Sequence, residues 1–239
     1  TTGSTTADAT ITLTFTSSRA TSTFAVGDIT VTGGALSSFA ATSSTVYTAT
    51  FTPSGAGATT VDVDASTFTD SVGGNNNSAA TQFTWTYDNV GPSMAITSTT
   101  SGVTTGSTTN DATIAITFTA SEATSNFIEG DITLTNGSLS GFTAVSSTVY
   151  TATFTPAGAG ATAIDIAGST FTDSLSNNNS AATQFVWTYD NAAPTVVLTG
   201  PTGVAATAFD VIATFSESVT GLATNEITVT NGTVTTLTG

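Results

Sequence analysis

Apolar residues recur at every second position in short segments of the chain. In residues 112–120, Ile114, Ile116 and Phe118 alternate with alanine and threonine, and residues 183–189 alternate in the same way. A period of two in segments rich in threonine, valine, isoleucine and aromatic residues is typical of β-strands with one buried face. No segment shows a convincing 3.6-residue period of an amphipathic helix. The pattern therefore predicts a nearly all-β protein.

Clusters of glycine, proline and asparagine separate these segments, for example at 136–137, 156–160 and 176–180. Seven short antiparallel strands in about a hundred residues are typical of an Ig-like β-sandwich. Between residues 90 and 191 we place such strands near 94–100, 112–120, 131–136, 139–145, 148–155, 161–172 and 183–189.

The chain contains an internal repeat of about a hundred residues. Residues 45–53 (TVYTATFTP) return unchanged as 148–156, and residues 85–89 return as 187–191. A third unit begins at Pro194. We therefore predict tandem Ig-like β-sandwiches of about seven antiparallel strands each, arranged head to tail. Repeat 1 takes residues 1–89 and lacks a first strand, repeat 2 takes 90–191 and is complete, and repeat 3 takes 192–239 with N-terminal strands only.

Incomplete sandwiches at both ends would expose unpaired strand edges, which is unfavourable for a free monomer. Two explanations stay open. Either the chain is a window of a longer array, or neighbouring copies of the chain complete the ends by donating a strand.

The charge of the chain limits its partners and its chemistry. Among 239 residues there are 16 acidic side chains, one basic side chain (Arg19) and no histidine, lysine or cysteine, and the net charge is -15. Nucleic acid and anionic membranes are poor partners for such a surface, whereas cations are good ones. No stretch reaches the roughly 18 to 20 apolar residues of a membrane helix, so we expect no membrane insertion. Without histidine and cysteine, catalytic triads and thiol chemistry are excluded, and we expect no enzyme.

The residues 215–221 (FSESVTG) and 225–232 (NEITVTNG), with counterparts at 118–122 (FTASE), 130–132 (GDI) and 171–173 (FTD), resemble the bacterial Ig-like repeats of giant surface adhesins and other extracellular repeat proteins. The resemblance covers essentially the whole chain. It implies an extracellular or cell-surface protein whose repeats form the stalk of an adhesin or the shaft of a filament. It also implies structural calcium at or near the domain junctions.

Strand direction predicts where acidic residues of repeat 2 meet. The second strand returns toward the incoming linker and brings Glu122 to that pole, and the strand before the last also ends there, with Asp173 and the loop 177–179. Carboxylate and carbonyl oxygens are the ligands that Ca²⁺ prefers. The alternative is that aspartate and asparagine are simply good loop formers. The candidate calcium ligands are Asp88, Asn89, Glu122, Asp131 and Asp173 for repeat 2, and Asp190, Asn191, Glu217 and Glu226 for repeat 3.

Repeat 1 departs from this pattern, because Arg19 stands where repeat 2 has Glu122. An arginine at this place could pair with Asp28 or Asp70 and replace the metal, so we expect weak or no calcium binding there. An exposed, solubilising Arg19 is the alternative.

Two further functions compete with a structural role. The repeats could bind a glycan or a host or cell-surface protein through loops at one pole, or they could be auxiliary domains of a surface hydrolase. Trp85 and Trp187 could form a carbohydrate platform, but their alternation with threonine favours packing in the core.

Overall fold

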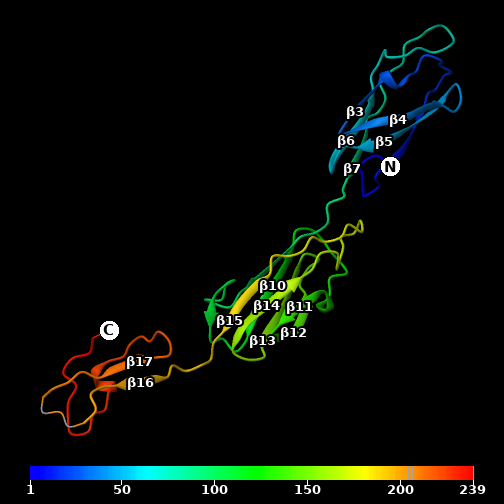
Figure 1. The fold of residues 1–239 in the computed structure, drawn as a ribbon. Helices are drawn as coiled ribbons and strands as arrows, with labels where there is room; N and C mark the ends of the chain where they lie inside the picture. Colours follow the sequence, from blue (N-terminus) through cyan, green and yellow to red (C-terminus); the bar gives the residue numbers. More distant parts are fainter. Residues whose placement is uncertain (204, 206, 239) are drawn as a thin grey trace. The chain divides into compact units, whose positions relative to one another are not determined.

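The computed structural model describes residues 1–203, 205 and 207–238. It divides into two units, Thr1–Tyr189 and Asp190–Gly239. The first unit contains two β-sandwiches, which we call module 1 (residues 1–87) and module 2 (residues 88–189). The second unit carries one small antiparallel sheet (Figure 1). The predicted nearly all-β fold of Ig-like sandwiches is confirmed.

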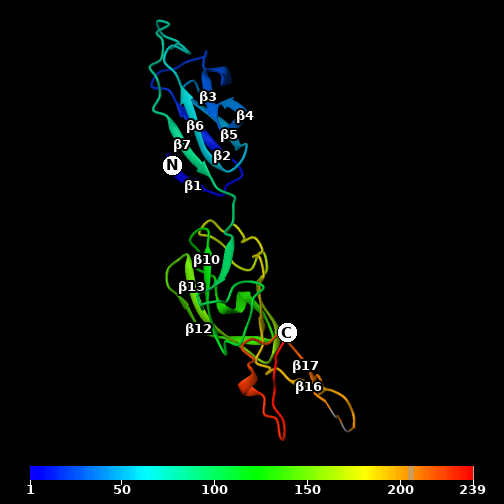
Figure 2. The same ribbon diagram turned by 90° about the vertical axis from the view of Figure 1, so that its left-hand side faces the viewer.

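Module 1 packs a four-stranded sheet against a three-stranded sheet. Its strands follow the alternating segments of the sequence, with apolar side chains directed between the sheets. The first sheet has the order β1 (Ser4–Thr6), β7 (Phe83–Tyr87), β6 (Gly57–Val63) and β3 (Ile29–Thr32), and the second has the order β2 (Ile11–Thr16), β5 (Val46–Pro53) and β4 (Gly34–Ala41). Figure 2 shows β1 beside β7.

Module 2 repeats this arrangement with one strand more. Its two sheets have four strands each, because an additional strand flanks the counterpart of β2. The first sheet has the order β12 (Gly137–Ala144), β13 (Val149–Pro156), β10 (Ile114–Ala120) and β8 (Met94–Ser98), and the second has the order β11 (Ile132–Thr135), β14 (Gly160–Ile166), β15 (Phe185–Tyr189) and β9 (Thr108–Thr109).

Aromatic and branched side chains fill the space between the sheets. Phe118 and Phe154 of module 2 are fully buried. The two tryptophans, Trp85 and Trp187, are only 2% and 1% exposed. The predicted packing of both tryptophans in the cores is therefore confirmed, and neither offers a ring to a carbohydrate.

Side-chain hydrogen bonds fix the loops at one pole of each module. The Tyr150 hydroxyl donates to the Thr124 carbonyl at 2.9 Å. The Asn179 carboxamide oxygen accepts from the backbone N–H groups of Thr170 and Phe171 at 2.8 and 2.9 Å. Since Asn179 is only 3% exposed, these bonds hold the loop around Asp173 rigidly in place.

The structure differs from the strands predicted from the sequence in two places. Residues 167–172 were expected to continue a strand, but β14 ends at Ile166 and a loop pinned by Asn179 follows. The short strands β1 and β9 were not predicted, and they pair in parallel with the last strand of their module. Elements of two or three threonine-rich residues are too short to show a period.

The second unit contains β16 (Val196–Thr199), β17 (Ile212–Phe215) and the single 3-10 turn η3 (Thr224–Glu226). A third strand was expected near residues 227–232, and residues 227–229 do not form one. Its counterpart β11 pairs with β14 in module 2, whereas among the described residues of the second unit only β16 and β17 are paired. Across the residues that the structure describes, helices long and apolar enough to cross a membrane are not found.

Candidate metal centre

Three carboxylates meet at the pole of module 2 where the chain enters. Asp88 follows β7, Glu122 follows β10, and Asp173 lies in the loop after β14. One carboxylate oxygen from each lies within 4.8 Å of the other two. The strand-direction argument had placed these residues together, and within the described residues they are the one such acidic group.

The incoming linker is bonded into this pole. The Asp88 N–H donates to the Thr6 carbonyl at 3.0 Å, and the Asp88 carbonyl accepts from Asn177 Nδ2 at 3.1 Å. Pro92 is buried, and its carbonyl accepts from the Ser180 N–H at 3.0 Å. Asp88 is therefore hydrogen-bonded to residues of both modules.

Glycine is required at position 91 of this linker. A Cβ atom there would overlap the backbone carbonyl of Asn178. The close approach of the linker to the loop 177–179 therefore depends on the absence of a side chain.

Asp173 is the most buried member of the group, with 8% of its surface exposed. One of its oxygens accepts from the N–H groups of Leu175 and Asn177, both at 2.8 Å. The other accepts from Asn177 Nδ2 at 2.9 Å. These bonds fix the direction of the carboxylate, as a preformed ligand requires.

Glu122 is the member of the group whose pKa is shifted by its surroundings. Its partial burial, first, and the charges of Asp173 and Asp88, second, raise the pKa of this carboxyl above its ordinary value of 4.5. No histidine, lysine or arginine occurs in module 2, so no side chain of the module neutralises the group.

The donor set suits a hard divalent cation. All three side chains offer oxygen, and the chain has no histidine or cysteine. Calcium binds six to eight oxygens with flexible geometry, whereas magnesium demands a near-ideal octahedron. Asp88, Glu122 and Asp173 fit a calcium ion as ligands, with further oxygens from backbone or water.

Asp131 and Glu226 were predicted as ligands, and the structure gives them another role. The Asp131 carboxylate accepts from the Ile128 N–H at 2.9 Å and closes the 3-10 turn η2 (Glu129–Asp131). Glu226 closes η3 by accepting from the Ala223 N–H at 2.9 Å. Each carboxylate thus caps its own turn through one oxygen, and Asp131 does not join the acidic group.

The remaining candidates lie as follows. Asn89 and Asn191 are exposed residues of the two linkers, and Glu217 is exposed after β17. The Asp190 carboxylate accepts from the Ala192 N–H at 3.0 Å, as that of Asp88 accepts from the Val90 N–H at 3.1 Å. Among the described residues of the second unit, no group of three carboxylates comes together.

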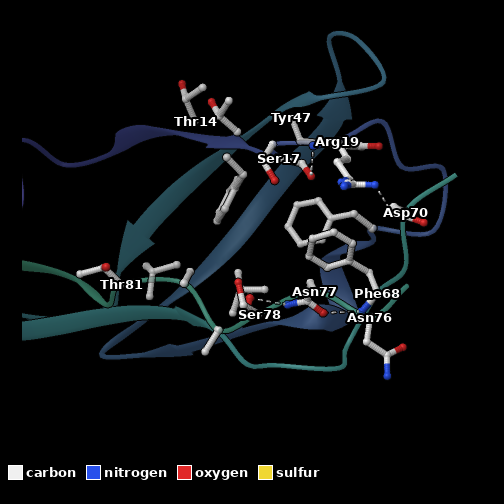
Figure 3. Close-up of a pocket in the computed structure, with 18 of the residues that line it drawn as sticks. Thr14, Ser17, Arg19, Tyr47, Phe68, Asp70, Asn76, Asn77, Ser78 and Thr81 are labelled. Atoms are coloured by element: carbon white, nitrogen blue, oxygen red, sulfur yellow. Dashed lines mark hydrogen bonds and ion pairs between the residues drawn. The ribbon is translucent and has the colours of Figure 1, made fainter. Parts of the chain in front are cut away.

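At the equivalent pole, module 1 has an ion pair instead of an acidic group. Arg19 Nη1 lies 3.5 Å from Asp70 Oδ2 (Figure 3), which confirms the predicted pairing with Asp70. The side-chain and backbone hydrogen bonds from Asn75, together with Arg19, lower the pKa of Asp70 below its ordinary value of 3.8. Asp28, the other predicted partner, instead accepts from the Ala25 N–H at 2.8 Å and caps the turn η1 (Val26–Asp28).

Sequence reasoning treated Asn177 only as a member of an asparagine loop. The structure shows that it joins Asp173 to the linker through one carboxamide. Asn75 of module 1 makes the same bonds to Asp70, at 3.0 Å from its N–H and 3.1 Å from Nδ2. The recurrence of this aspartate–asparagine pair in both repeats was the available signal.

Comparison with known proteins agrees with the repeat. The family model described as bacterial Ig-like domain matches residues 1–87 and again 88–188. No curated protein sequence matches the chain significantly.

Several solved structures are similar to this chain at low sequence identity. InvD of Yersinia pseudotuberculosis is 22% identical, with a TM-score of 0.34, over 82% of this chain and 60% of that one. Invasin, described as a bacterial integrin-binding protein, is 19% identical, with a TM-score of 0.37, over 81% and 39%. The adhesin InvE of Y. pseudotuberculosis is 16% identical, with a TM-score of 0.30, over 78% and 56%. The chain thus spans between about two fifths and three fifths of these proteins.

Proposed function

Since the chain belongs to the family of bacterial Ig-like domains, we propose that it is a structural, non-enzymatic part of an extracellular repeat protein at the cell surface. Its modules form the stalk of an adhesin or the shaft of a filament. The junction between modules 1 and 2 is stiffened by a calcium ion bound to Asp88, Glu122 and Asp173.

The observation that carries this proposal is the double attachment of Asp88. Its backbone is hydrogen-bonded to Thr6 of module 1 and to Asn177 of module 2. Its carboxylate belongs to the acidic group of module 2. A cation bound there would tie the linker to the pole of module 2 and restrict the linker's rotation.

Electrostatics supply the driving force. Like charges about 4 to 5 Å apart repel by about 1 kcal/mol per pair even in water. A bound divalent cation replaces this repulsion by attraction to the carboxylates, and its binding stabilises the folded state. The lack of any basic residue in module 2 leaves this neutralisation to a bound ion.

A mechanical role also agrees with the surface chemistry. Only 7% of the residues are charged, and no histidine or cysteine is present, so histidine-dependent triads and thiol chemistry have no residues to use. Threonine-rich strands and buried aromatic cores give each module a stable, inert body.

The test is calcium binding to the full chain. Isothermal calorimetry should show one strong site per chain for Ca²⁺ and much weaker binding of Mg²⁺. Small-angle X-ray scattering should show a narrower distribution of intramolecular distances with calcium than with EDTA. The variant Asp173→Asn should lose both effects, whereas Asp165→Asn, outside the acidic group, should keep them. Calcium binding that survives Asp173→Asn unchanged would refute the assigned site.

A further inference from the structure

Four asparagines of the chain head the tripeptide Asn-x-Ser/Thr. They are Asn76, Asn136, Asn178 and Asn231. In extracellular proteins this tripeptide, with any residue except proline in the middle, is the acceptor of N-linked sugars. Asparagine is also a common turn residue, so the tripeptide alone does not decide. The structure separates the four asparagines by what their backbone and their carboxamide do.

Turn geometry accounts for Asn136 and Asn231. Both have a positive φ, 54° and 56°, in the left-handed region that asparagine adopts more readily than most residues. Asn136 Nδ2 also donates to the Gly158 carbonyl at 3.0 Å and to the Ala161 carbonyl at 3.3 Å. An N-linked sugar replaces one of the two Nδ2 protons, so a modified Asn136 could not keep both hydrogen bonds.

Asn178 is the middle member of a loop of three asparagines in module 2. Its neighbours Asn177 and Asn179 each donate both Nδ2 protons to other groups of the protein. Asn178 is exposed, its φ is not in the left-handed region, and among the hydrogen bonds of the described residues none involves its carboxamide. Neither turn geometry nor hydrogen bonding therefore requires an asparagine at this position.

The serine of the same tripeptide, Ser180, is equally free. Its backbone is fixed, because its N–H donates to the Pro92 carbonyl at 3.0 Å and its carbonyl accepts from Asn179 Nδ2 at 2.9 Å. Ser180 is exposed, and its hydroxyl takes part in no hydrogen bond among the described residues. The carboxamide and the hydroxyl that define the acceptor tripeptide are thus both available on a loop whose backbone is held in place.

Module 1 has the same arrangement. Its residues 75–78 (NNNS) correspond to residues 177–180 (NNNS) of module 2. Asn75 and Asn77 again donate from Nδ2 within the module, whereas Asn76 is exposed. Figure 3 shows the Asn76 carboxamide clear of the other labelled side chains. The unbonded middle asparagine therefore recurs in both sandwiches.

We propose that Asn178 is a site of N-linked glycosylation and that Asn76 is its counterpart in module 1. The substrate is a sugar activated at C1 by a diphosphate, either a sugar nucleotide or a lipid-linked sugar, and a transferase of the producing cell catalyses the step. A bond forms between Asn178 Nδ2 and C1, and the bond from C1 to the diphosphate oxygen breaks. The diphosphate leaves with the electron pair, and Nδ2 loses one proton. Such a modification rests on the extracellular location proposed above, and it does not involve the metal site.

The sugar would lie beside the linker that enters module 2. A Cβ atom on Gly91 would overlap the Asn178 carbonyl, so the two backbones are in contact. Val90 of the same linker is 58% exposed. Exposed connections are preferred sites of proteolytic cleavage. A sugar on Asn178 should therefore slow cleavage of the linker.

Mass spectrometry of the full chain, purified from the cells that produce it, tests the assignment. Thermolysin generates the peptides, because Arg19 is the single site in the chain for trypsin. We expect a sugar on Asn178 and on Asn76, and at least about tenfold lower occupancy at Asn136, where the sugar would cost a hydrogen bond. An added mass of single hexose units indicates a sugar nucleotide as the donor, whereas one larger fixed mass indicates a preassembled, lipid-linked glycan.

Two variants of Ser180 provide matched controls. Ser180→Ala removes the acceptor hydroxyl and should leave Asn178 bare, whereas Ser180→Thr restores the tripeptide and should keep the sugar. Because the Ser180 hydroxyl is unbonded, both variants should melt as the wild type does, and Asn76 should stay modified in both. Limited proteolysis should cut the linker of Ser180→Ala faster than that of Ser180→Thr.

A bare Asn178 in the folded wild-type chain overturns the assignment, and so does a sugar on Asn178 that survives Ser180→Ala. Equal occupancy of Asn136 and Asn178 overturns it too, since a free carboxamide would then not select the site. Fractionation of the same cells tests the location separately. Chain at the cell surface without a sugar refutes the modification alone, whereas chain retained inside the cell refutes the proposed location.

Discussion

Replacing Glu122 by glutamine should stabilise module 2 without calcium and destabilise it with calcium. Glutamine keeps the size of the side chain and removes its charge. In calcium-free protein, Glu122 only repels Asp88 and Asp173, which raise its pKa together with burial. Glu122→Gln should therefore stabilise module 2 in EDTA. With calcium, the same change removes a ligand and should destabilise the module.

The magnitude follows from the distances within the group. The carboxylate oxygens lie within 4.8 Å of one another. At that limit each pair of charges repels by about 0.9 kcal/mol in water, and Glu122 takes part in two of the three pairs, so its neutralisation releases about 1.7 kcal/mol. Physiological salt screens part of this, since its Debye length is about 8 Å, while partial burial strengthens it. We expect a gain of roughly 1 to 2 kcal/mol, which raises the melting temperature of a domain of this size by about 5 to 10 °C.

Calcium should stabilise the wild-type module by more than this gain. At a concentration one hundred times its Kd, a single bound ion adds about 2.7 kcal/mol. Glu122→Gln should lose most of this stabilisation by calcium. The melting temperature of the variant should thus lie above that of the wild type in EDTA and below it in calcium.

Differential scanning calorimetry of the full chain in EDTA and in calcium measures both effects. Module 1, where Arg19 replaces the glutamate, provides an internal reference transition. Glu129→Gln is the matched control, because it removes the same charge from an exposed side chain of module 2 outside the acidic group. A lower melting temperature for Glu122→Gln in EDTA, or an undiminished calcium effect, would refute the reasoning.

Three other predictions concern the poles of the two modules. In EDTA, module 2 should lose stability as the pH rises from 4.5 through the raised pKa of Glu122, because the folded state binds that proton more tightly than the unfolded chain. Module 1 should lose stability as the pH falls from 3.8 through the lowered pKa of Asp70. Denaturant unfolding between pH 3 and 7 checks both directions. Asn179→Ala should cost roughly 2 kcal/mol or more, since it leaves buried N–H groups without acceptors, and urea unfolding should show it. Tyr150→Phe should cost about 1 to 2 kcal/mol by leaving the Thr124 carbonyl unpaired, measured in the same way.

The strands could be predicted where the period of two runs over five or more residues. The segments now seen as β10, β13 and β15 alternate clearly, and their core residues Ile116, Phe154 and Trp187 are buried. The two-residue strand β9 could not be found in this way. Its position depends on the parallel pairing of Thr108 and Thr109 with β15, which is a tertiary contact.

The acidic group could be predicted from chain direction, because a sandwich with short loops places alternate strand ends at the same pole. This placed Asp88, Glu122 and Asp173 together. The argument failed for Asp131, since direction alone does not say where a side chain points. There the nearest unpaired N–H group, that of Ile128, captures the carboxylate, as local backbone donors do for short acidic side chains.

The two modules of the first unit show that one position decides the electrostatics of this pole. Both keep the aspartate and the asparagine that donates to it, in the pairs Asp70–Asn75 and Asp173–Asn177. In module 1 the chain itself supplies a counter-charge, because the exposed Arg19 lies 3.5 Å from Asp70. Glu122 gives module 2 a third negative charge instead, and on the proposed function an ion from the medium would neutralise it. If the proposed calcium site is correct, a repeat array that mixes both kinds of pole would contain modules with their own counter-charge and modules that respond to calcium, and the residue at the position of Arg19 and Glu122 would decide between them.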